Sequence, residues 1–180
     1  PGPAAIRYPR GTGPGAIIAN EMTEMEIGKA LEVPRGERVA ILSFGTLLQE
    51  AMIAAEELNA TVVDMRWVKP LDEELILTAA SVYELLVTVE ESALMGGGGS
   101  GVGEVLAESG IAVSQLNLGI PDSFVEHGAH NEQVTWLGLN GYSIAQRIRQ
   151  RLSPPCSIFT CTNAPGLVGA GPQAAPASNT

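Results

Sequence analysis

Four consecutive glycines and a serine separate an apolar run from a helix-like stretch in MGGGGSGVGEVL, residues 95–106. Free amide groups at the start of a helix bind anions, so this segment could hold a phosphate. It lacks the Lys-Ser/Thr ending of a Walker loop and the full context of a dinucleotide-binding fingerprint. Glu90 and Glu91 precede it, and two carboxylates would disfavour a nearby phosphate. The pattern favours a tight turn or close backbone packing, with anion binding as the alternative.

A second candidate for anion binding is Arg10, in the segment IRYPRGTGPG. Pro9 fixes the backbone just before it, and a guanidinium group can bind a phosphate or carboxylate through two parallel hydrogen bonds. Taken alone, these residues favour an exposed Arg with a structural role over an anion ligand.

His127 and His130, in FVEHGAHNE, are the only histidines. A proton-transfer role next to Glu126 is conceivable, but the pattern favours a loop histidine with a structural hydrogen bond. Cys156 and Cys161 are too few to predict a zinc site or a disulfide framework, so we interpret them as incidental thiols. The sequence therefore predicts no catalytic, cofactor-binding or metal-ligating residue in this chain.

Charge and hydropathy exclude several classes of partner. Twenty acidic residues against ten basic ones give a net charge of -10, which would repel nucleic acids and anionic membranes. The chain has neither a bilayer-length apolar stretch nor a secretory leader pattern, so we expect a cytoplasmic protein. Because the 180 residues begin with Pro rather than Met, we also expect a fragment of a longer protein.

The elements that would position these residues follow a regular alternation from residue 37 onward. Apolar runs rich in Val, Ile and Leu alternate with segments of helical spacing, which is typical of βαβ units in an α/β fold. Such runs suit strands buried on both faces, so we expect a mostly parallel sheet whose carboxyl ends share one edge. The predicted strands are residues 38–45, 61–68, 85–91 and 111–119.

Helix boundaries are also predicted. Thr46 and Asp72 precede segments of helical spacing and are expected to be N-caps. Residues 139–152 form an amphipathic helix with Ile144, Ile148 and Leu152 on one stripe. The uncharged sequence beyond Pro154, rich in Pro, Gly, Ala and Ser, predicts disorder.

Five blocks of the sequence, in order, resemble the C-terminal region of the 1-deoxy-D-xylulose-5-phosphate synthase family. This is a thiamine-diphosphate-dependent family of the transketolase superfamily, and the resemblance runs from about residue 3 to residue 152. The blocks are AIRYPRG, AILSFGTLLQEA, ELNATVVDMRWVKPLDEELI, LLVTVEESALMGGGGSGVGEVL and LNLGIPDSFVEHG.

The resemblance implies a domain organisation. Residues 1–15 would end a pyrimidine-binding domain, 16–36 would be a linker, and 37–152 would form a transketolase-like C-terminal domain. That domain would be a three-layer sandwich with a mostly parallel sheet of about five strands. Residues 153–180, the predicted disordered tail, have no counterpart in the family.

The resemblance also implies a function. Family members condense pyruvate with D-glyceraldehyde 3-phosphate, releasing CO2 and supplying precursors of isoprenoids, thiamine and pyridoxal. The Arg of YPRG helps to bind the acceptor's phosphate, which assigns substrate binding to Arg10. Thiamine diphosphate and Mg2+ would be bound mainly by regions absent from this chain, so the chain alone should be inactive. The intact enzyme would be a homodimer.

Some features depart from the family pattern. The chain has GGGGSGVGE where the family commonly has GGAGSGVNE, and residues 130–148 match only loosely. The alternatives are the C-terminal domain of a 2-oxoacid dehydrogenase β subunit or of a transketolase, or a non-catalytic binding or scaffold module.

Overall fold

The computed structural model describes residues 2–6, 8, 13, 15, 20, 21, 23–33 and 36–153. Arg10, Cys156, Cys161 and the predicted disordered tail from residue 154 onward lie outside the described residues. Within the described part, no helix is both long enough and apolar enough to cross a bilayer.

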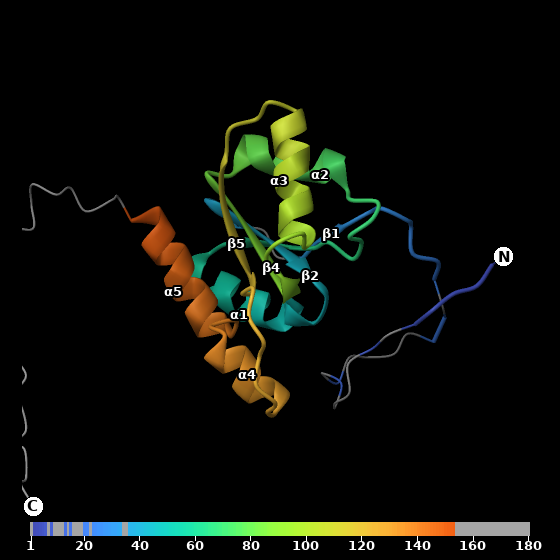
Figure 1. Ribbon diagram of the computed structural model, residues 1–180. Helices are drawn as coiled ribbons and strands as arrows, with labels where there is room; N and C mark the ends of the chain where they lie inside the picture. The colour runs from blue at the N-terminus through green and yellow to red at the C-terminus, as the bar shows by residue number, and fades with distance from the viewer. Residues whose placement is uncertain are drawn as a thin grey trace, which may run out of the picture.

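A five-stranded sheet forms the centre of the fold (Figure 1). Its strands lie in the order β1-β3-β2-β4-β5; β2 to β5 run parallel, and β1 pairs antiparallel with β3. The prediction of a mostly parallel sheet of about five strands is confirmed. The strands are β1 Leu31–Glu32, β2 Val39–Phe44, β3 Thr61–Asp64, β4 Leu85–Ala93 and β5 Ser114–Ile120.

The apolar runs become strands because both faces of the sheet are covered. All six residues of β2 are buried, and alternate side chains enter different cores. Val39 and Ile41 pack in one core, whereas Ala40 and Leu42 pack in the other. A strand buried on both sides carries no polar face, which explains its nearly continuous apolar sequence.

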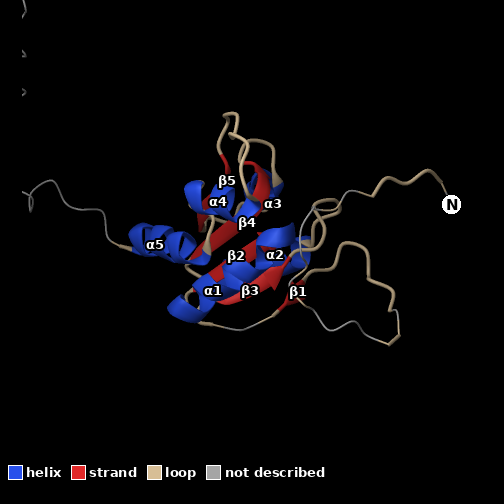
Figure 2. Ribbon diagram, turned by 90° about the horizontal axis from the view of Figure 1, so that it is seen from below, coloured by secondary structure: helices blue, strands red, loops and turns tan. Residues whose placement is uncertain are grey.

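Helices on both faces complete a three-layer arrangement, as predicted (Figure 2). Residues of α1, α4 and α5 share the first core with the sheet, and residues of α2 and α3 share the second. Ile144 and Ile148 of α5 are fully buried, which confirms the predicted stripe. The helices are α1 Leu48–Leu58, α2 Glu73–Val82, α3 Gly98–Glu108, α4 His130–Trp136 and α5 Gly141–Leu152, with a short 3-10 helix at Gly45–Leu47.

One of the two predicted caps is wrong. Asp72 caps α2 as predicted, since its side chain accepts a hydrogen bond from the Leu75 amide at 3.2 Å. Thr46 instead lies inside the 3-10 helix, and α1 begins at Leu48 without a side-chain cap. The Thr46 hydroxyl donates to Glu91 of β4, because a carboxylate accepts a stronger hydrogen bond than a neutral group.

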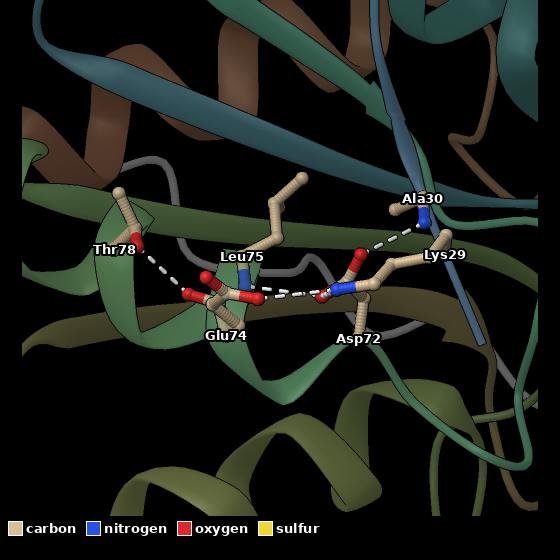
Figure 3. A network of polar contacts seen from close by, with 6 residues as sticks. All are labelled: Lys29, Ala30, Asp72, Glu74, Leu75 and Thr78. Atoms are coloured by element: carbon tan, nitrogen blue, oxygen red, sulfur yellow. Dashed lines mark hydrogen bonds and ion pairs between the residues drawn. The ribbon is translucent and has the colours of Figure 1, made fainter.

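Asp72 also attaches the segment before β2 to the domain (Figure 3). It is buried and accepts a hydrogen bond from the Ala30 amide at 3.0 Å, while Lys29 Nζ lies 3.7 Å from its other oxygen and 3.1 Å from Glu74. Ala30 directly precedes β1, so these contacts fix the start of the edge strand. Residues 29–32 therefore belong to the folded unit.

Candidate functional site

The candidate site within the described residues is a crevice at the edge of the sheet where the parallel strands have their carboxyl ends. The chain order reverses at β2, because β3 lies on one side of it and β4 on the other. Ligands of open α/β sheets bind at such switch points. A pocket of about 380 Å³ lies here, within the range of about 300–1,000 Å³ usual for small-molecule sites. It is lined by Tyr8, Phe44, Gly45, Thr46, Arg66, Val68, Glu90, Glu91 and Ser92.

Glu90 fills the position at the start of α3 that a phosphate would occupy. Its side chain is only 2% exposed, and its oxygens accept hydrogen bonds from the amides of Gly98 at 2.7 Å and Gly99 at 2.9 Å. The Ser92 hydroxyl donates to the same carboxylate. The amides that could bind an external anion are therefore already paired with an internal one.

The glycines permit this close approach of the backbone. A Cβ atom on Gly97 would come within 3.0 Å of Glu90, and one on Gly99 within 3.0 Å of Thr88. A Cβ atom on Gly98 would lie 3.0 Å from the ring of Phe44. The interpretation of the glycine cluster as a site of close packing is confirmed.

Glu91 connects three elements beside the pocket. It accepts a hydrogen bond from Thr46, after β2, and lies 2.5 Å from Nε2 of His130, the first residue of α4. The hydrogen bond with Glu91 raises the pKa of His130, and partial burial opposes this rise. His127 lies exposed in the preceding loop. Of the two histidines noted in the sequence, His130 is thus the one that contacts a residue lining the crevice.

Arg66 is a pocket residue that the sequence reasoning missed. It adopts a left-handed conformation with φ of 55°, just after β3, and its amide donates to Oδ1 of Asp64 at 3.2 Å. Its Nε atom lies 3.7 Å from Oδ2 of Asp64, and its side chain is 30% exposed. The sequence predicted that the strand continues to residue 68, because TVVDMRWV contains no glycine or proline to mark the turn.

The structure does not place the predicted substrate ligand, Arg10. Tyr8, two residues earlier, lines the pocket and is 80% exposed. The described residues contain no cluster of three or more His, Cys, Asp or Glu that could hold a metal ion. The role assigned to Arg10 stays a prediction.

Comparison with known proteins assigns the fold to a family. The family model described as transketolase, C-terminal domain, matches residues 28–144. The 1-deoxy-D-xylulose-5-phosphate synthase of Chromobacterium violaceum is 53% identical over 151 residues, and that of Pseudomonas aeruginosa (strain LESB58) is 54% identical over 151 residues. Each match covers 84% of this chain and 24% of the relative, so the chain spans about a quarter of the relatives' length.

A solved structure shows the same fold. It is a split-gene transketolase described as an inactive beta4 tetramer, and it superposes with a TM-score of 0.64 at 30% sequence identity. The match covers 71% of this chain and 42% of that one.

Proposed function

Since this chain belongs to the transketolase C-terminal domain family, we propose that it is the C-terminal part of a 1-deoxy-D-xylulose-5-phosphate synthase. The observation that carries the proposal is identity of 53% over 84% of the chain to an enzyme of that name. The complete enzyme would join pyruvate to D-glyceraldehyde 3-phosphate, forming 1-deoxy-D-xylulose 5-phosphate and CO2. We further propose that it is cytoplasmic and homodimeric.

The similarity to the split-gene transketolase suggests an alternative, namely a transketolase subunit. The split-gene transketolase is 30% identical to this chain, well below the identity to the synthases. We therefore favour the synthase, in which residues 1–15 would end the pyrimidine-binding domain, 16–36 would be the linker, and 37–152 would form the C-terminal domain.

Thiamine diphosphate and Mg2+ would be bound elsewhere in the complete enzyme. The described residues do not fit either group, because Glu90 occupies the amides of Gly98 and Gly99 and no acidic cluster suits a metal ion. The described part of the chain would therefore support the catalytic domains without contributing to cofactor chemistry. On its own, the chain should show no synthase activity.

Arg10 would bind the phosphate of D-glyceraldehyde 3-phosphate. A planar guanidinium group suits a phosphate dianion, and anchoring this remote group would position the aldehyde for reaction. In a complete enzyme that ends with this chain, Arg10→Ala should raise KM for D-glyceraldehyde 3-phosphate by about ten- to a hundredfold, because the substitution removes one charged hydrogen-bonding group. KM for pyruvate should change little.

Steady-state kinetics with each substrate varied in turn would test this role. Arg38→Ala is a matched control, because Arg38 is exposed and pairs with Glu84 away from the crevice. Equal losses for both substrates in Arg10→Ala would contradict phosphate binding. Absence of synthase activity from the complete unsubstituted enzyme would contradict the proposed function itself.

A further inference from the structure

Among the described residues, the pocket at the switch point contains one cationic side chain, and most of its donors have no partner in this part of the chain. Of the described residues that line it, Arg66 alone carries a positive charge. Its nearest carboxylate, Asp64, is 3.7 Å from Nε, which is beyond hydrogen-bonding distance. No described residue pairs with the terminal nitrogens of the guanidinium group, so they can bind a ligand that offers two oxygens.

The backbone holds Arg66 in place at the pocket. Residues other than glycine seldom adopt positive φ, so a φ of 55° requires support from the surroundings. The support is the hydrogen bond from its own amide to Asp64, at the end of β3. The charged group is therefore presented from a constrained turn at the edge of the sheet.

The two carboxylates of the pocket are already paired within the protein. Glu90 accepts from two amides at the start of α3 and from Ser92, and Glu91 bonds with Thr46 and His130. Their charges still act on a ligand through space. Since Coulomb energy scales with ligand charge, they would oppose a dianion about twice as strongly as a monoanion.

We propose that this pocket binds a small monocarboxylate with an apolar body. The carboxylate would pair with the guanidinium group of Arg66, and the body would lie against the ring of Phe44 and the side chain of Val68. Both apolar residues line the pocket, Phe44 at the end of β2 and Val68 after β3. The proposal concerns binding to this chain by itself, so it does not depend on the proposed synthase activity or on Arg10.

Nuclear magnetic resonance titrations of the isotope-labelled 180-residue chain would test the site. Benzoate is the probe, and phenyl phosphate is its matched comparator, because it has the same ring and is mainly a dianion at pH 7.5, given a second phosphate pKa of about 6. Benzoate should shift the amides of Gly45 and Ser92 and the Nε–H of Arg66 saturably, and should bind more tightly than phenyl phosphate.

Substitutions separate this site from non-specific binding. Arg66→Gln should weaken benzoate binding about tenfold or more, through loss of a charged hydrogen-bonding group. Val68→Asp should also weaken it by adding a carboxylate; Val68 is 59% exposed, so this change should leave the fold intact. Arg38→Gln, at an exposed Arg outside the pocket, should bind benzoate normally.

Three results would overturn the proposal. The first is tighter binding of phenyl phosphate than of benzoate, and the second is the lack of a saturable shift of the pocket resonances. The third is unchanged benzoate affinity in a folded Val68→Asp or Arg66→Gln chain.

Discussion

At the scale of single residues, Glu90 shows how a protein can use an anion-binding geometry internally. Its sequence position, just before the glycine cluster, suggested only that it would repel a phosphate. In the structure it is itself the anion, bonded to the Gly98 and Gly99 amides and buried beneath the start of α3. A helix N-terminus stabilises a negative group, and here that group is supplied by the neighbouring strand.

Two glycines of α3 offer a matched test of the close packing. In Gly99→Ala the new Cβ would collide with the buried hydroxyl of Thr88, whereas in Gly103→Ala it would lie 3.4 Å from Gln115, an ordinary contact. We expect Gly99→Ala to lower the free energy of unfolding by about 1–3 kcal/mol through overpacking. Gly103→Ala should raise it by up to about 1 kcal/mol through helix propensity.

Urea unfolding followed by circular dichroism would compare the two glycine variants. Similar changes in both would indicate that helix propensity, and not packing against β4, determines which residues α3 accepts at these positions.

At the scale of elements, α4 depends on a contact that local sequence does not reveal. A protonated histidine at the start of a helix is unfavourable because the helix dipole is positive there. Glu91 offsets this effect for His130, and Glu50 of α1 adds a smaller favourable charge interaction. The pair therefore anchors α4 to the carboxyl edge of the sheet.

This contact predicts a dependence of stability on pH. The pKa of His130 is raised in the folded chain above its ordinary value of 6.5. The pair's contribution is complete below pH 6.5 and is lost as pH rises through the higher folded-state pKa. Because His130 is 56% exposed, solvent screening should limit the effect to less than about 1 kcal/mol.

Urea unfolding at several pH values between 5.5 and 8.5 would measure this component of stability. His130→Gln should remove it, and His127→Gln, at the exposed loop histidine, should leave it unchanged. Identical pH profiles for His130→Gln and the unsubstituted chain would contradict the assignment.

The elements also show what the sequence could predict. Continuous apolar runs identified four strands because burial on both faces leaves a compositional pattern, and Asp72 was identified as a cap because its amide partner is local. The partner of Thr46 lies 45 positions away and that of His130 lies 39 positions away, so neither pairing follows from spacing. The helix α4 was not predicted because its seven residues are too few to show a clear helical pattern. Its anchor, the contact of His130 with Glu91, is also distant in sequence.

At the scale of the whole molecule, one buried carboxylate joins the pairing of β1 with β3 in attaching the N-terminal segment to the domain. Asp72 bonds the Ala30 amide and the Leu75 amide, which belong to segments more than 40 positions apart. Lys29 adds an ion pair, and its hydrogen bond with Glu74 is the main cause of its raised pKa. Asp72 thus caps the start of α2 and also fixes the segment that leads into β1 (Figure 3).

Asp72→Ala should consequently loosen both segments together. Loss of a helix cap and of a hydrogen bond to a charged group should lower the free energy of unfolding by about 1–3 kcal/mol. Hydrogen exchange should accelerate at the Ala30 and Leu75 amides in the same variant, since one side chain protects both. Glu74→Gln is the control, because its side chain is 84% exposed and it removes only the surface ion pair with Lys29. Faster exchange at Leu75 with unchanged protection at Ala30 would mean that pairing of β1 with β3 holds the segment without Asp72, and that Asp72 serves only as the cap of α2.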